Sequence, residues 1–179
     1  MNWRNDVPKF PNCHYRINVP WSYLTTMLHK YVDEYGLDMN PDFQRGHIWT
    51  EEQQIRYVEF VLRVPQSGLE IYFNHPGWQG SFNGHFVLVD GKQRLEAARR
   101  FLANEIPAFG CPCKDIEWPG KRGVSRDVEF FFNVACLKKR ADVLRWYLDF
   151  NSGGTPHAEA EIQRVRQLLA KEFDEEMVC

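Results

Sequence analysis

The chain has 179 residues and a formal net charge of −2, and 44% of its residues are hydrophobic. This apolar content is enough for a real core and excludes a disordered chain, while the length fits one domain with a small helical appendage. The small net charge excludes a global basic field, so contact with nucleic acid would need a local basic patch.

No run of about 18 apolar residues occurs, and the sequence does not begin with a signal peptide. We therefore expect a soluble, cytoplasmic protein with no membrane partner. The five cysteines are an odd number, and Cys111 and Cys113 form a C-x-C pair without a second pair of ligands. Reduced thiols and no resident metal are the expected state.

The first third of the chain has the pattern of an extended lead-in followed by two helices. Residues 1–19 are polar and interrupted by proline, which favours an extended chain. Apolar residues recur at helical spacing over 20–35, and Gly36 is a typical helix stop. A capping box formed by Thr50 and Gln53 begins the second helix. Its buried side is expected to comprise Ile55, Val58, Phe60, Val61 and Leu62.

Five short segments have the apolar, β-rich pattern of strands. They are 37–39, 69–73, 86–89, 106–109 and 128–134. Turn residues at Pro76-Gly77 and Asn83-Gly84 predict a hairpin arm around 78–82. Further helices are predicted over 92–103, 138–149 and 157–175.

The most informative stretch runs from Val87 to Leu102, where a strand turns through one glycine into a helix. Backbone N–H groups point outward at such a helix N-terminus, which suits an anion and above all a phosphate. Arg94 lies in the first turn and can add a bidentate contact, while Asp90 can hold a metal, a ribose hydroxyl or the loop itself. An ordinary Asp-Gly turn before a helix is the alternative interpretation. Neither a P-loop nor a Rossmann fingerprint is present.

Two other polar stretches lie at the edges of regular elements, one at 41–49 and one at 151–156. If they converge with the Asp90 turn, the pocket would be cationic with one acid and would suit a nucleoside triphosphate with Mg²⁺. The alternative is that Arg45 and Arg94 pair on the surface with acidic neighbours. Those neighbours would be Asp42, Glu51 or Glu96.

Other catalytic patterns are weak or missing. His47 is a candidate general base, but a lone loop histidine is more often a surface residue. No Ser–His–Asp or Cys–His arrangement has a convincing spacing, and the acid cluster or H-N-H pattern of a nuclease is absent. Basic residues could instead contact a nucleic-acid backbone, although a solvated helix face explains them equally well. These residues are Lys92, Arg94, Arg99, Arg100, Lys121, Arg122 and Arg126.

Three motifs in order resemble the N-terminal domain of GmrSD-type restriction endonucleases, the DGQQR-motif family of the ParB/sulfiredoxin-like superfamily. They are Pro41-x-Phe-Gln-Arg-x-x-x-Trp49, Val89-Asp-Gly-Lys-Gln-Arg-Leu95 and Phe150-Asn-Ser-Gly-Gly-Thr-Pro156. The resemblance covers roughly residues 20–170. Lys92 stands where the family usually has Gln, and His157 replaces the usual Leu.

The resemblance implies an α/β (α+β) fold, a ParB/sulfiredoxin-like core with a small mixed sheet, flanking helices and a C-terminal helical pair. The core would span 20–135, with an insertion at 110–124, and the helices 136–179 would pack on it after the lead-in 1–19. It further implies binding and hydrolysis of a nucleoside triphosphate in DNA restriction, modification or phage defence. Asp90, Arg94 and Arg45 would be catalytic. The nucleotide would be bound by Gln44, Gly91, Lys92, Gln93, Asn151, Gly153 and Gly154.

Family members carry a C-terminal nuclease domain that this sequence lacks, so a separate nuclease or other protein partner is expected. Two other functions stay open. One is a non-hydrolytic module that binds DNA or a protein partner, and the other is an ATP-dependent phosphotransferase or nucleotide-processing enzyme that uses the same pocket.

Overall fold

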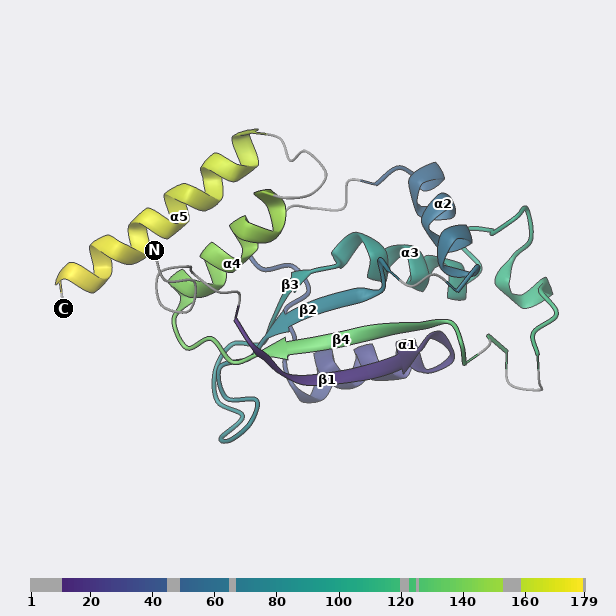
Figure 1. Cartoon of the computed structure of the whole chain (residues 1–179), viewed down its shortest axis with the longest axis horizontal. Helices are drawn as coiled ribbons and strands as arrows, with labels where there is room; N and C mark the ends of the chain where they lie inside the picture. The colour runs from purple at the N-terminus through teal and green to yellow at the C-terminus, as the bar shows by residue number, and fades with distance from the viewer. Residues whose placement is uncertain are drawn as a thin grey trace, which may run out of the picture.

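The computed structural model describes residues 11–44, 49–64, 67–119, 123–124, 126–152 and 159–178. Its centre is a four-stranded mixed sheet in the order β1-β4-β2-β3 (Figure 1). The strands are β1 (Cys13–Pro20), β2 (Glu70–Asn74), β3 (Val87–Asp90) and β4 (Glu129–Ala135). β4 runs antiparallel to β1 and parallel to β2, whereas β2 and β3 are antiparallel. The expected α/β class with a small mixed sheet is therefore confirmed.

One face of the sheet packs against three helices and holds the larger hydrophobic core. The helices are α1 (Trp21–His29), α2 (Glu51–Val61) and α3 (Lys92–Leu102), and a π-helical segment (Lys30–Glu34) extends α1. Tyr31 from this segment contacts the rings of Phe73 and Phe132, which come from β2 and β4. Because these side chains are buried apolar rings, they join the helical layer to the sheet.

The opposite face packs against α4 (Arg140–Ser152), which in turn packs against α5 (Glu159–Val178). Val87 and Val89 of β3 meet Leu144 and Trp146 of α4 in a second, smaller core. Figure 1 shows α4 and α5 side by side at one end of the sheet, with α2 and α3 at the other. No helix among the described residues is both long and apolar enough to span a bilayer.

Local sequence signals predicted most helix ends correctly. Gly36 has φ +66° after the first helix, and Thr50 and Gln53 form both hydrogen bonds of the capping box. β2 and β3 pair antiparallel across the 75–86 connection, but residues 78–82 contain no strand, so the hairpin arm predicted there is wrong. A 3₁₀ turn (Cys113–Asp115) lies within the predicted insertion.

Three predictions about segments are corrected. The lead-in is, from Cys13 onward, the edge strand β1, which pairs with β4 more than a hundred residues away. The segments 37–39 and 106–109 contribute only single bridges, Asp38 to Val87 and Ala108 to Cys111. Phe60 is 43% exposed rather than buried, and α2 instead buries Gln54.

Candidate functional site

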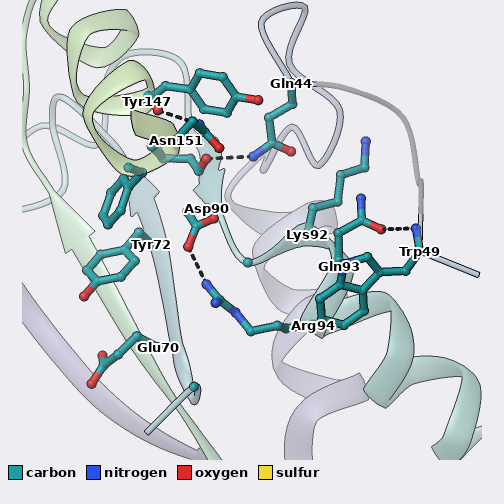
Figure 2. Close-up of a pocket in the computed structure, with 14 residues that line it drawn as sticks. Gln44, Trp49, Glu70, Tyr72, Asp90, Lys92, Gln93, Arg94, Tyr147 and Asn151 are labelled. Carbon is teal, nitrogen blue, oxygen red and sulfur yellow. Dashed lines mark hydrogen bonds and ion pairs between the residues drawn. The ribbon is translucent and has the colours of Figure 1, made fainter. Parts of the chain in front are cut away.

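A pocket of about 420 Å³ opens where β3 ends and α3 begins (Figure 2). Gln44, Trp49 and Asn151, from the two other polar stretches, line it together with the Asp90 turn, so these members converge as the prediction required. Strand β2 and the last turns of α4 form the other walls. The lining comprises Gln44, Trp49, Gly68, Glu70, Tyr72, Val89, Asp90, Gly91, Lys92, Gln93, Arg94, Tyr147, Phe150 and Asn151.

Gly91 makes the turn from strand to helix possible. Its φ of +103° is unfavourable for other residue types, and a Cβ there would lie 2.6 Å from Ile71 Cδ1. The helix begins directly after it, because Leu95 N–H donates to Gly91 O over 2.9 Å. The N-cap residue Gly91 makes no side-chain capping hydrogen bond, so the positive end of α3 lies at the wall of the pocket, which Asp90 also lines.

Arg94 forms an ion pair with Asp90, one helical turn away, at the centre of the pocket (Figure 2). The surface pairing considered for Arg94, with Asp42, Glu51 or Glu96, is therefore wrong. Both side chains are largely shielded, at 24% and 33% exposure. Arg94 Nε is buried and has no hydrogen-bond partner among the described residues. Since a buried donor without an acceptor is costly, this atom is available to a ligand or a water molecule.

Two glutamine side chains of the pocket, Gln44 and Gln93, form hydrogen bonds with the main chain around it. Gln44 Nε2 donates to Leu88 O over 3.0 Å and to Val89 O over 2.9 Å, at the end of β3. Its Oε1 is buried without a partner in the described part of the chain. Gln93 Oε1 accepts from the main-chain N–H of Trp49 over 3.1 Å. Both amides therefore position the backbone around the Asp90 turn.

Lys92 lies at the rim of the same pocket and extends away from the Asp90–Arg94 pair (Figure 2). Burial lowers the pKa of Lys92, while the negative charges of Asp38 and Glu96 act in the opposite direction. A phosphate near this ammonium would favour its charged form, so anion binding and protonation of Lys92 would support one another.

Glu70 and Tyr72 of β2 and Tyr147 of α4 line the pocket but were not predicted as site residues. Tyr72 contacts the ring of Phe150 at a centroid distance of 4.6 Å. Glu70 binds Arg16 over 2.8 Å and also accepts from Asn133. The strand pattern of 69–73 could have shown that Glu70 and Tyr72 share one face, but not that this face meets α4.

Asn151, which the resemblance assigns to nucleotide binding, lines the pocket, and its amide donates to Tyr147 O. Arg45, Gly153 and Gly154, like His47, lie outside the residues that the structure describes.

The basic residues of α3 that could contact nucleic acid mostly form ion pairs within the protein. Arg99 binds Glu96 and Glu105, and Arg100 binds Glu51 and Glu105. Arg126 is exposed, and Lys121 and Arg122 lie outside the described residues. Since the guanidinium groups of α3 already have carboxylate partners, this helix presents less positive charge than its sequence indicates.

No group of three or more His, Cys, Asp or Glu side chains in the described ranges could hold a metal ion. The pocket does contain the carboxylates of Asp90 and Glu70. This donor set fits Mg²⁺ only in company with a phosphate ligand, because Mg²⁺ is commonly held by one or two carboxylates, substrate phosphates and waters.

No family model matches the chain, and no curated protein or solved structure is significantly similar to it.

Proposed function

We propose that the pocket at the start of α3 binds a nucleoside triphosphate and hydrolyses it, as the resemblance to the DGQQR-motif family implies. The observation that supports this most directly is the uncapped N-terminus of α3 beside Arg94, both at the wall of one cavity. Helix N-terminal N–H groups together with an arginine are a common means of binding phosphate. On this proposal the fold is a ParB/sulfiredoxin-like core.

The walls of the pocket match the parts of a nucleotide. The phosphates would lie on the N–H groups after Gly91 and next to Arg94, with Lys92 at the rim. The base would lie against the aromatic wall of Tyr72, Tyr147 and Phe150, because a ring face stacks on any base.

The charged side chains of the pocket determine how a triphosphate could bind. Among the described lining residues, the positive charges of Lys92 and Arg94 are balanced by the negative charges of Glu70 and Asp90. A triphosphate would therefore meet two carboxylates as well as two cations. Mg²⁺, held by Asp90, would supply charge neutralisation at the phosphates. Arg94, which pairs with Asp90 in the structure, would then be free to stabilise charge on the phosphoryl group, together with Arg45.

Calorimetry with ATP, GTP, CTP and UTP in the presence of Mg²⁺ tests the proposal. We expect one nucleotide to bind, and Arg94→Ala to weaken that binding by about tenfold or more, in line with the loss of a charged hydrogen bond. Arg56→Ala is the matched control, because Arg56 is exposed and binds Glu52 on the outer side of α2. Binding by none of the four nucleotides, or equal binding by both variants, would contradict the proposal.

Phosphate release from the same samples, with and without DNA, distinguishes hydrolysis from binding alone. Transfer of labelled γ-phosphate to an acceptor other than water would instead support a phosphotransferase. We further propose a cytoplasmic role in DNA restriction or defence with a separate nuclease partner, for which stimulation by DNA is the expected sign.

A further inference from the structure

A second cavity, of about 280 Å³, lies at the opposite end of α4 from the nucleotide pocket and shares no lining residue with it. The start of α4, the segment 41–43, the end of β2 and the connection from β2 to β3 enclose it. Its lining comprises Pro41, Asp42, Phe43, Asn74, Pro76, Gly84, His85, Val87, Leu137, Lys138, Lys139, Arg140 and Val143.

The interior of this cavity is apolar. Phe43, Val87 and Val143 are buried members of the second core, and the ring of Phe43 is held against Tyr147 at 5.2 Å. The buried polar side chain, Asn74, uses both ends of its amide on the main chain of Leu137, over 2.8 and 3.1 Å. The floor therefore favours an apolar group over a polar one.

The rim of the cavity is cationic, because Lys138, Lys139 and Arg140 follow one another along the chain. Arg140 already binds two carboxylates, Asp42 over 2.8 Å and Glu172 of α5 over 2.9 Å. Lys138 instead donates to the main-chain carbonyl of Pro76. This partner is neutral, so it does not balance the charge of the ammonium group. The rim therefore attracts carboxylates and already holds two of them.

We propose that this cavity binds an organic carboxylate, with an apolar group on the Phe43 floor and the acid group at Lys138 and Lys139. The volume lies just below the range of about 300–1,000 Å³ that is usual for ligand pockets, which indicates a small apolar group such as one aromatic ring. A free aromatic acid and an aromatic residue flanked by acidic side chains share this chemistry. The inference does not depend on the nucleotide proposal, since the two cavities are separate.

Amide NMR titration of the full chain tests the inference with two probes, 3-phenylpropionate and the blocked peptide acetyl-Glu-Phe-Glu-amide. We expect saturable shifts at Gly84, Val87 and Val143 with at least one probe, and the probe that binds more tightly identifies the source of the ligand. The double variant Lys138→Gln/Lys139→Gln should weaken binding about fivefold, as expected for the loss of exposed ion pairs. Lys114→Gln, at another exposed lysine, should leave binding unchanged.

The neutral analogue 3-phenylpropanol provides a control that does not depend on any variant. It should bind at least about fivefold more weakly than the acid, because it lacks the charge that the rim attracts. Equal binding of acid and alcohol, no shifts with either probe, or displacement of both probes by inorganic phosphate at lower concentration would overturn the proposal.

Discussion

Gly91 has a backbone conformation and a close contact that would destabilise the fold if another residue type replaced it. An alanine there combines the unfavourable φ of +103° with a Cβ only 2.6 Å from Ile71 Cδ1. We expect Gly91→Ala to lower the free energy of unfolding by about 2–3 kcal/mol, the upper part of the range for local backbone strain. Urea denaturation measures this quantity.

Gly110→Ala is the matched control at the residue scale. Gly110 also has a positive φ, +74°, but its Cβ would meet nothing within 4 Å. Its replacement should cost only about 1 kcal/mol, the backbone contribution alone. Equal losses of unfolding free energy in the two variants would show that the contact with Ile71 does not add to the destabilisation of Gly91→Ala.

The capping box at the start of helix α2 lies next to a residue that lines the pocket. Thr50 caps the helix, and the preceding residue, Trp49, donates its main-chain N–H to Gln93 and contacts the ring of Tyr57 at a centroid distance of 5.3 Å. Thr50→Ala should reduce the free energy of unfolding by about 1 kcal/mol, the usual value of an N-cap. Thermal and urea unfolding of the variant provide the measurement.

Thr25→Ala is the control for the cap, because Thr25 is exposed within α1 and caps nothing. Alanine has the higher helix propensity, so this variant should be neutral or slightly more stable. A similar loss in both variants would mean that the effect at Thr50 is not due to capping.

The stability of the whole molecule should depend on pH through His75, which is 1% exposed and begins the connection from β2 to β3. Its Nδ1 accepts from Gly77 N–H over 3.0 Å, and its ring contacts Trp78 and Phe86. Burial lowers the pKa of His75 from the ordinary 6.5, and the charge of Lys138 lowers it further. The unfolded chain therefore binds a proton more readily than the folded protein does.

Stability should consequently fall as the pH drops through 6.5 toward the lower pKa of the folded state. His75→Gln should remove this part of the pH dependence when urea unfolding is compared at several pH values. His85→Gln, at an exposed histidine, is the control. A pH dependence in His75→Gln as steep as in the unsubstituted protein would contradict the assignment.

The candidate site was predictable where its residues are consecutive. Asp90 to Arg94 follow a buried strand and begin a helix, so their shared position at one helix end follows from local geometry. Glu70 and Tyr147 line the same cavity but lie outside the three motifs. Nothing near them in the chain shows that β2 and α4 approach the start of α3, because that approach depends on packing between distant segments.

Short-range patterns in the chain were enough to specify the helices, their caps and the strand-to-helix turn at Gly91. Capping, helix periodicity and turn stereochemistry act within a few residues, so they can be read directly. Strand β1, the pairing of Arg100 with Glu51 and the second cavity beside Lys138 depended on the assembled fold. These features join residues tens of positions apart, and their energy comes from burial and pairing that exist only once the sheet and its two helical layers have formed.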